Sequence, residues 1–172
     1  MTAVLGRLLN VAIAGVLICG VAHAQQRPVD VKLVREYLDK MQLKYVAHPN
    51  STDTLVVPVT ENSNAERIDL YVEVRTDKTV VLTAYPRLRG KYFNSGRAAD
   101  RLKLFQKLAE TNFRSFASFF VDDQGDIGAR FTFTTEDGVG FEAFSTCVSE
   151  LSRIADEYTK TLDELMKKDE QH

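Results

Sequence analysis

The chain has 172 residues, 44% of them hydrophobic, with 22 Lys and Arg against 24 Asp and Glu. This length fits one ordinary domain, and the hydrophobic fraction is too high for a disordered chain and too low for a protein with several membrane spans. A net charge of −2 excludes a globally basic protein that collects nucleic acid through its phosphates. We therefore expect no nucleic-acid partner.

The first 24 residues have the composition of an export signal. Arg7 is their only charge, an apolar run follows it, and Ala22 and Ala24 stand at the small-residue positions of a cleavage site. The apolar run is shorter than the roughly 20 residues that a membrane-spanning helix needs. The sequence therefore predicts a signal peptide, residues 1–24, cleaved after Ala24, and a periplasmic or secreted mature chain without a transmembrane span.

The mature chain, residues 25–172, is predicted to form one domain. It has 148 residues and a net charge of −3, and it contains no linker, repeat or low-complexity segment. Its single cysteine, Cys147, has no intramolecular disulfide partner. Cys147 is expected to be a small apolar residue on a helix face, the alternative being a reactive thiol.

The first half of this domain is predicted to be a helix followed by strands. Apolar residues recur at helical spacing over 30–42, with Asp30 as the N-cap. Residues 43–48 and 54–60 have the composition of strands, and Pro58 favours an edge position because it has no amide hydrogen to donate.

The centre of the domain is predicted to be an antiparallel meander. Over 67–76, one residue in two is apolar, so this strand should have one buried face and one solvated face. A tight turn at Asp77 and Lys78 leads to a partner strand over 79–85. Residues 86–96 are expected to form a polar connection.

The second half is predicted to contain a helix, a hairpin and a long helix. The helix covers 96–111, and its expected buried stripe is Ala98, Leu102, Phe105, Leu108 and Ala109. Strands over 113–122 and 127–134 form the hairpin, with Gly125 in the turn. The last helix covers 141–168.

The last helix has an unbroken heptad pattern of apolar residues. One interpretation is that the helix lies across its own sheet and completes the core. The other is that its C-terminal half overhangs and pairs with a second copy or a client helix. On that hypothesis, the self-association residues are Tyr158, Leu162 and Leu165.

This order of elements resembles the YbjN-like family of bacterial domains, which are described as sensory transduction regulators. The segments that carry the resemblance are VREYLDKMQLKY, LYVEV, LAETNFRSFASFFVDDQGDIGARFTF and the last helix around Ile154, Ala155 and Asp156. The family's fold is similar to that of type III secretion chaperones. The resemblance implies a single α+β domain in which three helices pack on an antiparallel sheet of five to six strands, in the order α-β-β-β-β-α-β-β-α. It also implies binding of protein segments, with a homodimer as one option, and it carries no catalytic residues.

The sequence offers little material for catalysis or for a metal. After cleavage, only His48 and His172 remain, and no Cys/His cluster has the spacing of a zinc site. A calcium loop beginning at Asp122 would need Glu twelve positions along, where Phe133 stands. Cys147 with His48 is the one Cys/His pair, in no catalytic motif. We expect no cofactor, no metal and no catalytic residue.

A basic cluster in the connection before the second helix is the strongest candidate site. Its cations are interleaved with aromatic residues and lie close to an expected helix N-terminus, which favours an anion. The candidate ligand-binding residues are Arg87, Arg89, Lys91 and Arg97. The alternative is a solvated loop whose cations balance the acids of the chain.

Together these features predict an exported, non-catalytic binding or regulatory module that recognises a protein segment or an anionic ligand. Two alternatives remain open. One is a small periplasmic hydrolase with an unrecognised site, and the other is an envelope protein with a structural role.

Overall fold

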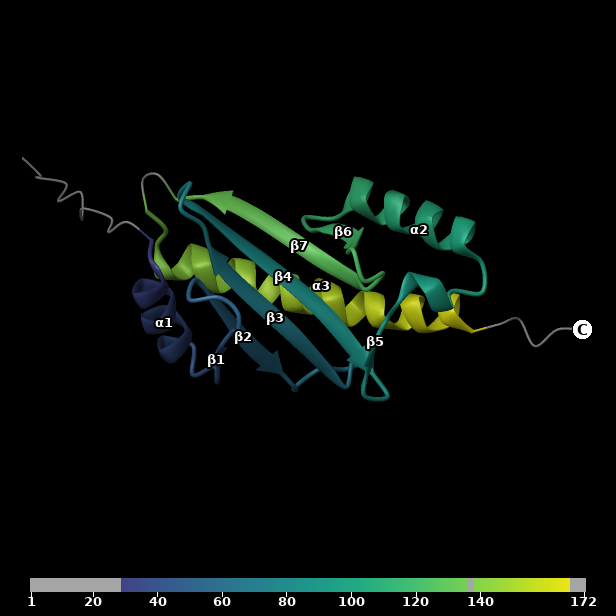
Figure 1. Ribbon diagram of the computed structural model, residues 1–172, viewed down its shortest axis with the longest axis horizontal. Helices are drawn as coiled ribbons and strands as arrows, with labels where there is room; N and C mark the ends of the chain where they lie inside the picture. The colour runs from purple at the N-terminus through teal and green to yellow at the C-terminus, as the bar shows by residue number, and fades with distance from the viewer. Residues whose placement is uncertain (1–28, 136–137, 168–172) are drawn as a thin grey trace, which may run out of the picture.

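The structure is a computed structural model that describes residues 29–135 and 138–167 (Figure 1). The predicted signal peptide lies outside the described residues. The helices are α1 (Val31–Lys40), α2 (Arg101–Arg114) and α3 (Phe141–Met166), with a 3-10 turn η1 (Ser95–Arg97) before α2. The strands are β1 (Val46–Ala47), β2 (Thr54–Val59), β3 (Arg67–Val74), β4 (Thr79–Leu88), β5 (Lys91–Tyr92), β6 (Ser118–Val121) and β7 (Ile127–Thr134).

The strands form one antiparallel sheet in the order β1-β2-β3-β4-β7-β6, with β5 paired to the end of β4. The predicted α+β class, with three helices on an antiparallel sheet, is confirmed. The described sheet has seven strands because residues 86–96, which were predicted to be a polar connection, contain the end of β4 and the additional strand β5. There β4 continues to Leu88, and the chain turns back through Arg89 and Gly90, which both have positive φ, into β5.

The core lies between the sheet and α3, which runs behind the sheet along the length of the molecule (Figure 1). The heptad residues Phe144, Val148, Leu151 and Leu162 are all at most 2% exposed. They share one apolar cluster with side chains of β2, β3, β4 and β7 and with Leu38 of α1. The interpretation in which α3 completes the core of its own sheet is therefore confirmed. None of the helices in the described part of the chain is both long and apolar enough to cross a bilayer.

The stripe predicted for the second helix is right for Leu108, which is buried, and wrong for Leu102, Phe105 and Ala109, which are exposed. Asp100 accepts a hydrogen bond from the Lys103 amide and caps α2, so the helix begins later than predicted. Leu104 and Leu108 are buried, whereas Leu102 is 69% exposed. The sequence contains two apolar stripes at helical spacing on α2, and only the packing against β6 and α3 decides which one is buried.

The strand predicted over 113–122 is shorter than expected. The helix α2 runs on to Arg114, and β6 begins only at Ser118. The strand predicted over 43–48 is likewise reduced to β1, which lies opposite Leu55 and Val56. Pro58 therefore lies beyond the end of β1, where β2 has no outer neighbour, and its predicted edge position is confirmed.

Candidate functional site

The sheet has a second face, which none of the described helices covers and which we call the open face. The strand registers place its residues opposite one another: Tyr71 of β3 faces Thr83 of β4, which in turn faces Arg130 of β7. The open face carries Arg67, Asp69, Tyr71, Glu73, Thr83, Tyr85, Arg87, Phe120 and Arg130.

A row of aromatic rings crosses the open face. The His48 ring lies 5.9 Å from that of Tyr71, Tyr71 lies 5.7 Å from Tyr85, and Tyr85 lies 5.8 Å from both Tyr92 and Phe120. Gly128, opposite Phe120 on β7, makes room for the row, because a Cβ there would come within 3.0 Å of the rings of Phe120 and Tyr85. We call these five residues, His48, Tyr71, Tyr85, Tyr92 and Phe120, the aromatic row.

Hydrogen bonds fix two rings of the row. The Tyr85 hydroxyl donates to Asp122 Oδ2 at 3.1 Å, and the Tyr92 hydroxyl donates to Asp69 Oδ2 at 2.5 Å. Partial burial, together with the nearby carboxylates, raises the pKa of both tyrosines well above its usual range. Both hydroxyls therefore stay protonated and act as donors at neutral pH.

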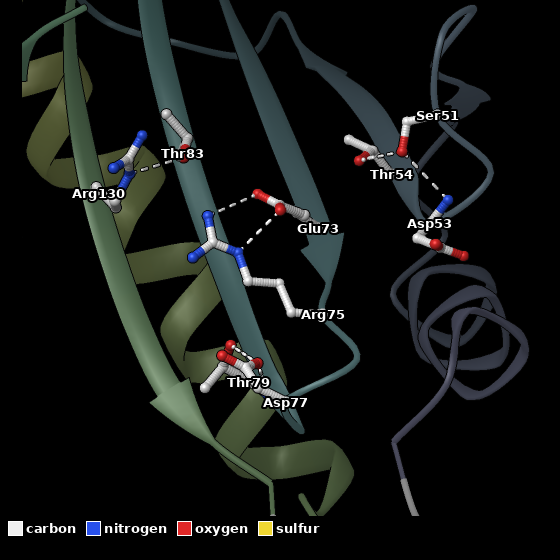
Figure 2. Close-up of polar contacts among 9 residues, drawn as sticks. All are labelled: Ser51, Asp53, Thr54, Glu73, Arg75, Asp77, Thr79, Thr83 and Arg130. Atoms are coloured by element: carbon white, nitrogen blue, oxygen red, sulfur yellow. Dashed lines mark hydrogen bonds and ion pairs between the residues drawn. The ribbon is translucent and has the colours of Figure 1, made fainter.

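A shallow pocket of about 330 Å³ lies over the row and is bounded by polar groups. Figure 2 shows some of these polar groups: Arg130 donates to the Thr83 hydroxyl, and Glu73 accepts two hydrogen bonds from Arg75. The lining residues are His48, Ser51, Thr54, Tyr71, Glu73, Thr83, Tyr85, Tyr92, Asp122, Gln124, Asp126 and Arg130.

Asp69 departs from the predicted alternation, because it points to the open face but is only 2% exposed. The β5 strand folds back beside β4 and brings Tyr92 over it. Arg67 lies 2.5 Å and Arg87 3.5 Å from the Asp69 carboxylate. This buried acid thus holds one of the predicted ligand-binding cations.

The predicted basic cluster surrounds the β4–β5 hairpin, and its four members differ in the ion pairs and hydrogen bonds that they form. Arg87 is paired with Asp69, and Arg89 lies 3.6 Å from Asp163 of α3. Lys91 and Arg97 form no ion pair among the described residues, although Arg97 donates to the backbone carbonyl of Tyr92. Arg87, Lys91 and Arg97 line a shallow pocket of about 340 Å³ with Tyr92 and Asn94.

The predicted self-association residues lie on α3 against the core. Tyr158 is 9% exposed and Leu162 is fully buried, while Leu165 is partly buried. Self-association stays a prediction, but the side chains of Tyr158 and Leu162 already pack in the core of their own chain.

A different element presents apolar surface to solvent. Four of the five exposed large hydrophobic residues in the described chain lie on or just after α2: Leu102, Phe105, Phe113 and Phe116 are 69%, 48%, 92% and 51% exposed. With the exposed Ala109 between them, we call these residues the α2 stripe.

The residues considered for nucleophilic catalysis do not come together. His48 lines the pocket on the open face, whereas Cys147 is on α3, which packs on the other face of the sheet. Burial raises the pKa of Cys147, which disfavours a reactive thiolate. Asp122 organises a turn, accepting from the amides of Gln124 and Asp126. Within the described residues, no group of three His, Cys, Asp or Glu side chains could hold a metal ion.

Solved structures of other proteins share this fold, including the following two. One is YbjN from E. coli, a candidate transcription regulator, with a TM-score of 0.57 and 16% identity over 81% of this chain and 96% of its own. The other is the ExsC–ExsE complex, with a TM-score of 0.57 and 14% identity over 78% of this chain and 97% of the matched chain. No family model and no curated protein matches the sequence.

These likenesses define the class of fold. The chain has a YbjN-like fold of the kind seen in secretion chaperones, as the resemblance in its sequence implied. The identities are too low to carry over more than the fold.

The sequence singled out neither the aromatic row nor the α2 stripe. The row runs from His48 to Phe120 in sequence and draws on four strands, so no local pattern shows it. Of the stripe residues, Leu102, Phe105 and Ala109 were predicted to be buried on a helix, and Phe113 and Phe116 were predicted to lie in a strand.

Proposed function

We propose that this chain is an exported, non-catalytic binding module whose protein-binding surface is the α2 stripe. Its structural neighbours, a candidate transcription regulator and a complex of two proteins, are consistent with a binding role. The observation that carries the proposal is the gathering of nearly all the exposed large hydrophobic side chains of the described chain on one helix and the turn after it. Contiguous apolar surface of this kind marks interaction sites.

The spacing of the α2 stripe favours a second copy of the chain as the partner. From Leu102 to Phe116, the intervals between successive stripe residues are 3, 4, 4 and 3, which is symmetric about Ala109. In a two-fold interface, a residue i that contacts j is matched by j contacting i. Antiparallel pairing about Ala109 would place Phe105 of each copy against Phe113 of the other, with the small alanine at the axis.

Sedimentation of the mature chain tests this proposal. We expect residues 25–172 to form a concentration-dependent dimer, and the double variant Phe105→Glu, Phe113→Glu to be a folded monomer. The matched control is Lys103→Glu, Lys107→Glu, which adds two acidic side chains on an exposed side of α2 away from the stripe and should leave the dimer intact. A wild-type monomer at millimolar concentration, or a double variant that still dimerises, would contradict the proposal.

Anion binding at the β4–β5 hairpin is a second candidate function. Lys91 and Arg97 favour it, because they are exposed cations without an ion-pair partner among the described residues. We expect pyrophosphate to shift the amide signals of residues 90–97, and Lys91→Ala, Arg97→Ala to abolish that shift. The control Lys32→Ala, Lys44→Ala removes the same charge elsewhere. An equal shift in both double variants would reject the site.

Export has its own test. The mass of the protein recovered from the periplasm or the medium should correspond to a chain that begins at Gln25. Recovery of the intact 172-residue chain in the cytoplasm alone would refute cleavage after Ala24.

A further inference from the structure

The pocket over the aromatic row has a chemistry that neither the α2 stripe nor the basic hairpin explains. We propose that it binds a neutral saccharide, whose pyranose rings lie against Tyr71 and Tyr85 while the hydroxyl groups meet the polar rim. This site lies away from the α2 stripe, so the two proposals can fail separately.

The rings offer a fixed apolar surface, and because Tyr71 and Tyr85 stand at 85° to each other, a given pyranose ring can lie flat on only one of the two. Tyr71 and Tyr85 line the pocket from adjacent strands, and the bonds of Tyr85 to Asp122 and of Tyr92 to Asp69 restrain the row before any ligand arrives. Binding to a preorganised surface avoids the entropic cost of ordering side chains. A pyranose ring presents C–H groups on its face, and these pack on aromatic rings, while its hydroxyls project from its edge.

The rim supplies donors and acceptors that suit hydroxyl groups. Arg130 is exposed, and only its Nε has a hydrogen-bond partner among the described residues, so its terminal nitrogens remain donors. Asp126 accepts from Asn94 through Oδ1, which leaves Oδ2 as an acceptor. Gln124, also in the lining, carries both donor and acceptor. A few placed polar groups around an apolar surface are typical of small-molecule sites.

The charges at the pocket disfavour an ionic ligand of either sign. Arg130, which lines the pocket, lies 4.3 Å from the centre of the Phe120 ring, so this ring already carries a cation. A further cation would meet this guanidinium group. An anion would meet Glu73, Asp122 and Asp126, which all line the pocket. A neutral, hydrogen-bonding ligand is repelled neither by the cation nor by the acids.

The position of the pocket disfavours an extended peptide. Its middle lies over β3 and β4, and both strands are paired on either side, so their backbone groups are already used. A peptide cannot add a strand there. A saccharide needs no backbone edge.

Tyrosine fluorescence can test this proposal, because the chain has no tryptophan whose emission would mask that of tyrosine. Three of the six tyrosines of the chain are in the row, so tyrosine emission reports on the pocket. The probes are linear, neutral trisaccharides of glucose and of N-acetylglucosamine, titrated to about 20 mM into the mature chain, because weak sites have millimolar affinity. We expect at least one of them to give a saturable change in emission.

The variants separate the ring from its hydroxyl. Tyr71→Leu keeps apolar volume without the ring and should weaken binding about tenfold, whereas Tyr71→Phe should stay within about threefold of wild type. The control Phe113→Ala, on the α2 stripe, should bind as wild type does. If Tyr71→Leu does not fold, the exposed Arg130→Ala provides the second variant, with an expected loss of about fivefold.

Several outcomes would overturn the proposal. These are no saturable change with any of the trisaccharides, equal affinity in Tyr71→Leu or Arg130→Ala and wild type, or saturation by tetramethylammonium or a polyproline peptide but by no saccharide. The first of these results leaves dimerisation through the α2 stripe untouched, so the two proposals remain distinguishable.

Discussion

A single carboxylate, that of Asp156, ties the long helix to the loop between β2 and β3. It accepts hydrogen bonds from the amides of Ser63, Asn64 and Ala65 at 3.0, 2.8 and 2.7 Å and is only 9% exposed. Burial alone would raise the pKa of Asp156, but the three backbone amides outweigh it and hold the pKa below its ordinary value. The charged form is thus built into the fold.

Asp156→Asn should destabilise the fold by about 2 kcal/mol at pH 7, because the amide offers one acceptor oxygen where the carboxylate offers two. Since the folded-state pKa is lowered, the contribution of Asp156 is complete above the ordinary pKa of about 3.9 and is lost as the pH falls below it. Urea unfolding of both proteins at pH 7 and pH 3 would show the difference between them shrinking. A difference that stays constant over this range would argue against an ionised Asp156 in the fold.

At the scale of elements, α2 shows where sequence patterns stop being sufficient. The alternation in β3 and the heptads of α3 identified their buried faces correctly, because each pattern had only one solution. On α2, the exposed pair Leu102 and Phe105 and the buried pair Leu104 and Leu108 both recur at helical spacing. Only contact with the rest of the fold distinguishes them, and that contact is made by residues distant in sequence.

The β4–β5 hairpin was missed for a related reason. Its turn is Arg89-Gly90, and arginine rarely takes positive φ, so the segment lacks the Asn-Gly signal of a two-residue turn. Residues outside the hairpin stabilise it. Glu66 accepts a hydrogen bond from the Gly90 amide, and Asp163 forms an ion pair with Arg89. Without the hairpin, neither the burial of Asp69 nor the placing of Tyr92 in the aromatic row could be foreseen.

The N-cap of α2 gives a prediction at this scale. Asp100→Ala removes the side-chain acceptor for the Lys103 amide and should cost about 1 kcal/mol of stability. Thermal unfolding should show this as a lower midpoint. Asp123→Ala, which removes an exposed acid from the β6–β7 turn, is the control and should leave the midpoint nearly unchanged.

At the scale of the whole molecule, the two faces of the sheet differ in what they contact. One face of the sheet packs on α3, and the other is the face on which we propose that a saccharide binds. The sequence predicted the first arrangement, because burial leaves a periodic pattern. It did not predict the second, because the aromatic row forms only when β3, β4, β5 and β6 come together.

Substitutions of Leu162 and Leu165 would show which part of α3 belongs to the core. Leu162 is fully buried, so Leu162→Ala should destabilise the fold by about 3 kcal/mol, whereas Leu165→Ala should cost about 1 kcal/mol. Denaturant unfolding at low protein concentration, where any dimer has dissociated, gives both values. Equal and small losses would instead place both side chains in an interface between copies.

The position of α3 in the chain also has a consequence for how the protein folds. The helix that covers β3, β4 and β7 follows all three strands in the chain, so the apolar face of the sheet stays uncovered until α3 has been synthesised. Contacts between segments so far apart in sequence form slowly, and exposed apolar intermediates aggregate. A nascent chain truncated before Phe141 should therefore depend on chaperones, because the apolar face of its sheet lacks the helix that covers it.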